Sequence, residues 1–236
     1  MVKRLSWSVI SVVMIACGLW SCTGLRPGRE PTPSTVDGMT IPQPRAGHFI
    51  YRVDSEHSEL RILVYRAGPL AKLGHNHVLI NRLLTGWIDM SGKPGSSSFA
   101  LVIPSRRFIV DESSSRREEG GDFDSLVDDD AKAGTLRNMQ SAALLDAGRF
   151  ESITVRSISI NGTEPNLTAG LVINVAGHES KVNAPFVVEQ MAGKLSATGT
   201  LKLRQSALGL APFSVMMGAL QVQDEITVKF RLAAGN

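Results

Sequence analysis

Residues 222–232 read VQDEITVKFRL, and from Ile226 onward hydrophobic and polar side chains alternate. Val228, Phe230 and Leu232 share one side of an extended chain, and the polar residues between them share the other. Successive side chains of a β-strand point to opposite faces of a sheet, so this alternation predicts a strand with one buried face.

Strand-like runs also precede this stretch. Residues 167–176, 181–190 and 194–204 are separated by short breaks that contain glycine, as antiparallel hairpins require. About eight or nine strands at this spacing predict an all-β sandwich or a closed barrel. The remaining candidate strands are residues 49–54, 59–66, 83–90, 99–104 and 153–160.

A single long helix is expected among these strands. Leu136, Met139 and Leu144 recur at helical spacing within residues 131–147, and Gly148 follows as a stop signal. The acidic stretch 111–130 lacks the glycine and final glutamate of an EF-hand loop, so it is interpreted as a solvated loop.

The first 21 residues have the pattern of a secretory signal peptide. Lys3 and Arg4 precede an uncharged apolar stretch, which ends at Ser21 before Cys22. The other cysteine, Cys17, lies inside this segment, so the mature chain is expected to form no internal disulfide. Residues 19–22, LWSC, resemble a bacterial lipobox. The resemblance implies lipidation of Cys22 and, with threonine following it, attachment to the outer membrane on its periplasmic side; a soluble secreted protein with an idle Cys22 is the alternative.

Composition then divides the rest of the chain. Residues 22–46 are rich in proline and poor in large apolar residues, which predicts an extended tether, and residues 47–236 form the expected barrel domain. Loss of the signal peptide lowers the formal net charge from +3 to +1. A near-neutral domain without a basic stripe excludes nucleic acid as an expected partner.

The segment YRVDSEHSEL, residues 51–60, resembles the opening Asp-x-x-His-Ser motif of the YceI-like polyisoprenoid-binding family. Residues 136–157, 171–186 and 201–210 resemble later segments of that family, in the same order. The resemblance implies an eight-stranded antiparallel, lipocalin-like barrel with one inserted α-helix. It also implies non-catalytic binding or carriage of a polyisoprenoid, quinone or related lipid in the bacterial cell envelope.

An eight-stranded barrel is either filled by its own side chains or able to hold one small ligand. Ala184, Ala197 and Gly199 are small, which favours a cavity, although each larger inward residue is also a candidate for simple core packing. The residues predicted to contact a ligand are Ile62, Val64, Trp87, Phe186, Val188, Leu201, Val228, Phe230, His57, His75 and His77.

Two other functions stay open at this point. His75 and His77 are two residues apart, so on a strand both imidazoles point to one face, which suits a metal or haem site with His57 as a candidate third ligand. In the lipid-binding interpretation the same pair would instead meet a polar head group. The other alternative is a ligand-free structural or stress-response module. No nucleophile motif such as Gly-x-Ser-x-Gly is present, so neither enzyme activity nor a cofactor is expected.

Overall fold

The computed structural model describes residues 35–36 and 38–236. The expected signal peptide, Cys22 and the first part of the expected tether therefore lie outside the described residues. The described residues form one compact unit that contains every strand described below.

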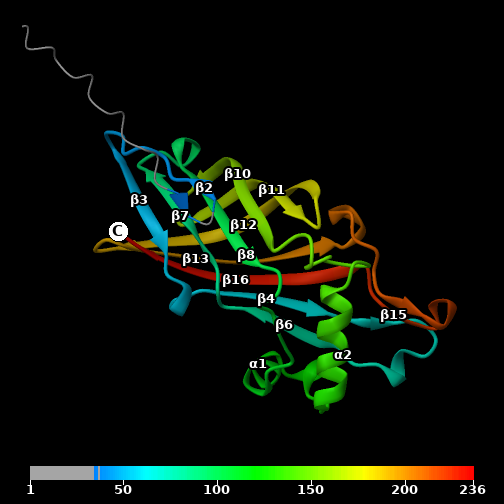
Figure 1. Cartoon of the computed structure of the whole chain (residues 1–236). Helices are drawn as coiled ribbons and strands as arrows, with labels where there is room; N and C mark the ends of the chain where they lie inside the picture. Colours follow the sequence, from blue (N-terminus) through cyan, green and yellow to red (C-terminus); the bar gives the residue numbers. More distant parts are fainter. Residues whose placement is uncertain (1–34, 37) are drawn as a thin grey trace, which may run out of the picture. The chain divides into compact units, whose positions relative to one another are not determined.

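Eight antiparallel strands close into a barrel, which confirms the expected fold class (Figure 1). Alternating apolar residues on each strand supply its inner face, as their period of two predicts. Closure comes from the pairing of the last two strands, in register from Lys194 opposite Gly235 to Arg204 opposite Glu225. In spatial order the strands are β3 (His48–Val53), β7 (Thr85–Ser91), β8 (Ser98–Pro104), β10 (Ser152–Thr163), β11 (Asn166–Val175), β12 (His178–Met191), β13 (Lys194–Arg204) and β16 (Glu225–Gly235).

A second group of strands extends the sheet from the other edge of β16. There β4 (Glu59–Val64) pairs with residues 227–231, while β3 pairs only with the end of β16. Strands β6 (His77–Asn81) and β9 (Ile109–Val110) then follow β4 in order. The sheet thus widens at this side.

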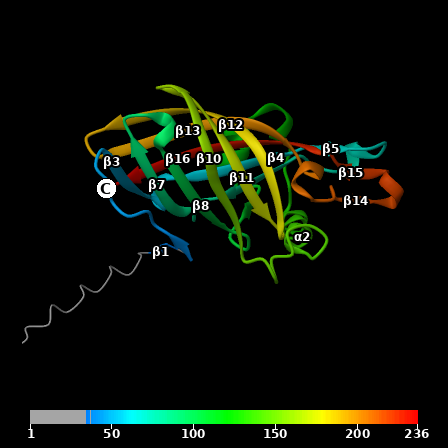
Figure 2. The same ribbon diagram turned by 90° about the horizontal axis from the view of Figure 1, so that it is seen from above.

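Three short strands form a separate small sheet. They are β14 (Ser214–Val215), β15 (Leu220–Val222) and β5 (Arg66–Ala67), in that order. Figures 1 and 2 both show this sheet projecting at the end of the barrel that lies away from the C-terminus. Another hairpin, β1 (Thr35–Val36) with β2 (Met39–Thr40), lies before the barrel.

The described residues contain two α-helices, where one was expected. Helix α2 (Asp129–Gln140) is capped by Asp128, whose side chain accepts a hydrogen bond from the N–H of Ala131 at 2.7 Å. It ends before the predicted boundary at residue 147, because Ser141 is extended and its hydroxyl donates to the carbonyl of Asn138. The chain then turns several times before β10.

Helix α1 (Ser113–Glu119) lies in the acidic stretch, so its interpretation as a solvated loop was wrong. Phe123, just after this helix, is buried against Leu63, Val78 and Ile80 on the outer face of β4 and β6. Shorter helical turns are η1 (Ser55–His57), η2 (Ala71–Leu73), η3 (Pro94–Ser96), η4 (Gly121–Phe123), η5 (Ser206–Leu208) and η6 (Met216–Gly218). No helix in the described part of the chain is long and apolar enough to cross a bilayer.

The region expected to be a tether contributes to the folded unit where it is described. Ile41 is buried, and the guanidinium of Arg45 forms an ion pair with Asp89 of β7. His48 contacts the other carboxylate oxygen of Asp89 through Nδ1 at 2.7 Å. The end of the predicted tether is therefore attached to the outer face of the barrel.

Candidate ligand-binding site

The barrel encloses a deep cavity of about 130 Å³. Its lining is apolar except for Ser97. The residues predicted to contact a ligand that line it are Phe186, Val188, Leu201, Val228 and Phe230. They do so because side chains alternate between the two faces of a strand, and each of these residues lies on the inward-facing side of β12, β13 or β16.

Small side chains make room in this cavity, but only at two of the three predicted positions. Ala184 and Ala197 line the deep cavity. Gly199 does not, because the ring of Phe230 lies where its side chain would be: a Cβ there would stand 2.5 Å from Cζ of that ring. The missing side chain at Gly199 thus accommodates a core aromatic residue.

A larger outer cavity of about 250 Å³ adjoins the deep one. Three of the residues predicted to contact a ligand line it: Ile62, Val64 and Val228. Helix α2 contributes Met139 to the lining. The two cavities share six lining residues, so they form adjoining parts of one apolar space: Leu60, Ile103, Val155, Ile173, Leu203 and Val228.

Apart from Ser97 in the deep cavity, every polar side chain of the lining lies in the outer cavity. They are His77 on β6, Thr135 and Asn138 on α2, and Gln205 after β13. Gln205 donates to the carbonyl of Gln223 at 2.9 Å. The site therefore has an apolar interior and a polar group at one end, which is the arrangement an amphiphile with one polar head requires.

His77 is held between the cavity and a buried carboxylate. Its Nδ1 lies 2.6 Å from Oδ2 of Asp111, and its Nε2 lies 3.3 Å from Oγ1 of Thr135. Asp111 is 1% exposed and also accepts from the N–H of Val78 and from Arg116. Asp111 thus orients the imidazole through Nδ1, and Nε2 is directed toward the cavity-lining Thr135.

The charge of Asp111 is maintained despite its burial. Burial raises the pKa of this carboxyl, but hydrogen bonds from His77, the Val78 N–H and Arg116 lower it by more, so it stays below its ordinary value of 3.8. An ionised Asp111 accepts hydrogen bonds only, so Nδ1 of His77 carries the proton that it shares with the carboxylate.

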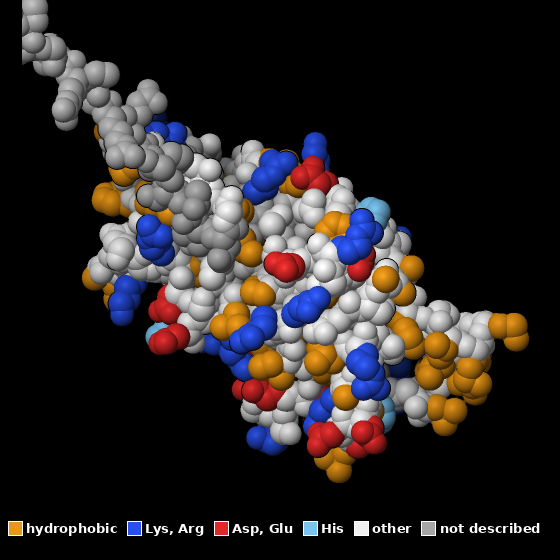
Figure 3. All heavy atoms as spheres, viewed as in Figure 1, with side chains coloured by type: hydrophobic (Ala, Val, Ile, Leu, Met, Phe, Trp, Pro, Cys, Tyr) orange, Lys and Arg blue, Asp and Glu red, His pale blue; other side chains and the backbone are white. Residues whose placement is uncertain are grey.

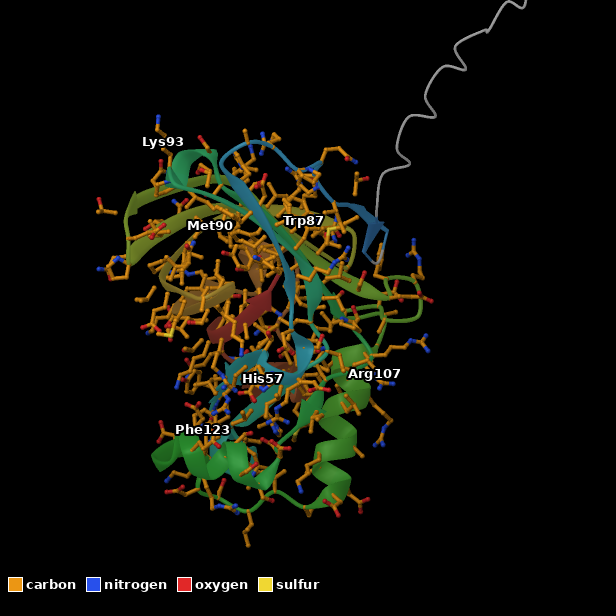
Figure 4. All side chains as sticks on the ribbon, turned by 90° about the vertical axis from the view of Figure 1, so that its left-hand side faces the viewer. His57, Trp87, Met90, Lys93, Arg107 and Phe123 are labelled. Atoms are coloured by element: carbon orange, nitrogen blue, oxygen red, sulfur yellow. The ribbon has the colours of Figure 1, made fainter. Side chains whose placement is uncertain are left out.

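Three of the predicted ligand contacts line neither cavity: Trp87, His57 and His75. The first two are labelled in Figure 4. Trp87 has the outward parity on β7, because its neighbour Ile88 points into the deep cavity. His57 lies on the surface turn η1, with its side chain 69% exposed and Nδ1 bonded to Asp54 at 2.8 Å. The ring of His75 lies 6.3 Å from that of His77 and lines neither cavity.

The histidines do not come together as a metal site. His57 lies on η1, apart from His75 and His77, and His77 already has a protein partner at each ring nitrogen. Within residues 35–36 and 38–236, no group of three or more His, Cys, Asp or Glu side chains could hold a metal ion. The pattern of two histidines two residues apart instead leads to one oriented imidazole at the cavity.

Sequence reasoning did not identify the polar residues on α2. Thr135, Asn138 and Met139 follow the spacing of one helix face, so the helical pattern could have indicated them once the helix was known to cover the barrel. Phe213 and Val222, which line the outer cavity beside the small sheet, carried no such signal. Their position depends on the pairing of β15 with β5.

The fold and the site together define a ligand-binding β-barrel: a closed antiparallel barrel that encloses an apolar cavity. The YceI-like domain family matches residues 51–234, and the chain belongs to this family. The family assignment agrees with the motif order seen in the sequence.

Solved structures with the same fold include BcnA from Burkholderia cenocepacia, at 15% identity and a TM-score of 0.58, covering 77% of this chain and 98% of BcnA. A polyisoprenoid-binding domain from Saccharophagus degradans, implicated in plant cell wall breakdown, matches at 12% identity and a TM-score of 0.51, covering 78% of this chain and 97% of that domain. At these identities the likeness shows a shared fold. A comparison with curated proteins finds no match.

Proposed function

We propose that this protein binds one apolar or amphiphilic lipid, such as a polyisoprenoid or a quinone, non-covalently inside its barrel and carries or sequesters it without catalysis. The observation that carries the proposal is the pair of adjoining apolar cavities with polar groups at one end. The polyisoprenoid-binding description of the Saccharophagus degradans domain supports the choice of ligand class.

The physical basis is hydrophobic burial. Removal of apolar surface from water contributes about 25 cal/mol per Å², or about 0.8 kcal/mol for each buried methylene. A lining with so few polar groups offers little besides this term, so affinity should rise with the length of the apolar chain until the cavity is filled. Chain length, more than head-group identity, would then select the ligand.

The polar end supports a defined orientation of the ligand. His77, Thr135 and Asn138 converge on the outer cavity, whereas the deep cavity has only Ser97. We therefore place the head group of an amphiphile against His77 and α2, and its tail toward Phe186 and Leu201.

The proposed cellular setting is the bacterial envelope. The signal-peptide pattern and the lipobox resemblance support export and lipidation of Cys22, with attachment to the outer membrane on its periplasmic side. These residues lie outside the part of the chain that the structure describes.

Native mass spectrometry tests the binding proposal. The chain from Gly24 onward, which contains the complete compact unit, would be secreted to a bacterial periplasm and weighed without denaturation. We expect a discrete added mass that moves into an organic extract of the same sample. A mass equal to the bare polypeptide, after incubation with polyprenols and quinones as well, would contradict the proposal.

The same sample distinguishes the metal alternative. Stoichiometric metal or a haem absorption band, together with an empty organic extract, would favour a metal- or haem-binding barrel. Extractable lipid without bound metal is the result that the lipid-binding proposal predicts.

A further inference from the structure

The small sheet ends in an exposed hydrophobic surface, which we call the apolar tip and define as residues 66–74 and 213–222. Met217 is fully exposed, Leu73 is 72% exposed and Met216 is 65% exposed. Phe213 and Val215 are also among the exposed hydrophobic residues. Figure 3 shows hydrophobic side chains gathered at this end, over the position of β15 in Figure 1.

Hydrogen bonds between its segments fix the backbone of the apolar tip. The N–H of Leu70 donates to the carbonyl of Ala219 at 2.8 Å, and the N–H of Val222 donates to the carbonyl of Phe213 at 2.9 Å. Gly68 lies so close to this turn that a Cβ would stand 2.6 Å from the same carbonyl oxygen of Ala219. The strands therefore hold the exposed turn in place.

The two methionines at its end have a backbone that residues with side chains rarely adopt. Met216 has φ 52° and Met217 has φ 53°, both in the left-handed region. Neither side chain packs into the core, since both are largely exposed. An exposed hydrophobic surface held this way usually marks a binding surface for a protein or a membrane.

The charges of the apolar tip favour a membrane as the partner. Its charged residues are Arg66 and Lys72, both basic, and it contains no acidic residue. Apolar side chains flanked by basic ones match the surface of a bilayer with anionic lipids, where each basic side chain contributes about fivefold in affinity.

The apolar tip is also continuous with the ligand site. Phe213 and Val222 belong to it and line the outer cavity. A lipid that leaves the outer cavity on this side would therefore meet the apolar tip before it met open water.

We propose that the apolar tip inserts into the surface of a bilayer containing anionic lipids, and so presents the outer cavity to the membrane. The exposed residues and the charges support membrane docking by themselves. Its use in loading or unloading a lipid rests on the proposed function. The competing occupant of this surface is a second copy of the chain.

Vesicle flotation with the chain from Gly24 onward tests the docking, because this chain lacks both the signal peptide and Cys22. The vesicles would contain equal parts of phosphatidylethanolamine and phosphatidylglycerol, with phosphatidylcholine vesicles for comparison. We expect binding to the anionic vesicles that weakens when salt is raised from about 0.1 M to about 1 M.

The variant Met216→Asn/Met217→Asn removes the apolar side chains, and asparagine tolerates the left-handed backbone. We expect at least about a tenfold loss of vesicle binding, because each methionine loses its burial in the bilayer. Met191→Asn is the matched control, since Met191 is 80% exposed on β12 and lies outside the apolar tip. Lys72→Gln should weaken binding to anionic vesicles about fivefold and leave the weaker binding to phosphatidylcholine unchanged.

Equal binding by the methionine variant and by Met191→Asn would overturn the proposal. So would a dimer in light scattering that dissociates in the methionine variant while the vesicles bind nothing, because the surface would then be a self-interface. Vesicle binding is measured on protein from which any ligand has been removed, so it does not depend on lipid binding inside the barrel. Failure of docking and failure of lipid binding are therefore separate results. Circular dichroism of each variant checks that it is folded.

Discussion

Gly199 and Phe230 show how a single missing side chain shapes the barrel interior. The two residues are paired across β13 and β16, and a Cβ at Gly199 would lie 2.5 Å from the Phe230 ring and 2.6 Å from the carbonyl oxygen of Pro185. The ring is at the end of a side chain and could move, but the carbonyl belongs to the neighbouring strand and cannot shift without disturbing the ladder.

We therefore expect Gly199→Ala to lower the free energy of unfolding by about 1–3 kcal/mol through overpacking. Gly92→Ala is the control, because a Cβ at Gly92 would meet no atom within 4 Å. Denaturant unfolding of both variants measures the difference. Equal stability of the two variants would show that both the Phe230 ring and the Pro185 carbonyl can move without cost.

Val228 is one of the six residues that line both cavities, so a larger side chain there should obstruct the ligand space. We expect Val228→Phe to reduce bound lipid by at least about tenfold while it keeps the fold, because the added ring enters existing space. The measurement is lipid extracted per mole of folded protein. Val187→Phe, on the outward face of β12 where Val187 is 38% exposed, should retain its lipid.

At the scale of elements, helix α1 is attached to the outside of the barrel by charges. Arg82, just after β6, pairs with Glu112 at 2.6 Å, and Arg61 of β4 pairs with Glu118 at 2.7 Å and with Glu119 at 2.9 Å. The hydrogen bonds from Arg82 are the main reason that the pKa of Glu112 falls from 4.5 to about 2. The acidic stretch thus forms ion pairs with basic residues far from it in sequence, one on β4 and one just after β6.

A lowered carboxyl pKa predicts loss of stability in acid. Glu112 stabilises the folded state above pH 4.5, and this contribution disappears as the pH falls toward about 2. Its side chain is 33% exposed, so screening limits the contribution to about 1 kcal/mol. Arg82→Gln should lower stability at pH 6 and reduce the loss between pH 5 and about pH 2. Thermal unfolding across this range, with hydrogen exchange of residues 113–119, measures both effects.

The control for this prediction is Lys132→Gln. Lys132 pairs with Asp129, whose side chain is 96% exposed, so its removal should change neither stability nor its acid dependence. An acid dependence that is the same in Arg82→Gln as in the unchanged protein would mean that another carboxylate holds α1.

Helix α2 shows where local pattern stops being sufficient. The spacing of Leu136, Met139 and Leu144 suited a helix to residue 147, and Leu144 does line the outer cavity together with Met139. It reaches the cavity from a turn after Ser141 instead of from a continued helix. Both routes bury the same side chain, so the burial pattern could not distinguish them.

At the scale of the whole molecule, the covalent lipid anchor is predicted to depend on Cys22. Cys22→Ser should abolish incorporation of a labelled fatty acid in a bacterial host, because the acyl chains need that thiol. Cys17→Ser is the matched control and should keep the label, since Cys17 lies within the expected signal peptide. A label retained by Cys22→Ser would exclude the proposed anchor.

The local pattern of the chain was sufficient to predict most of the barrel. The period of two in residues 194–204 predicted both ends of β13, and the short breaks with glycine are the hairpins between β11, β12 and β13. Parity along these strands also identified Phe186, Val188, Leu201 and Phe230 as inward residues. These features depend on neighbours a few residues apart, which sequence shows directly.

Long-range pairing decided the rest. Hydrogen bonds connect Asp111 to His77 and His77 to Thr135, and so link an acidic stretch, a strand and a helix. No spacing in the sequence predicts that Nδ1 of His77 lies 2.6 Å from Oδ2 of Asp111. Trp87 lies outside the cavity because its neighbour Ile88 occupies the inward-facing position on β7. The apolar tip exists because β15 pairs with β5, which lies more than half of the chain length away in sequence. Side chains near in space but distant in sequence are brought together by the packing of whole strands, so their arrangement follows from the closed barrel and not from any one segment of it.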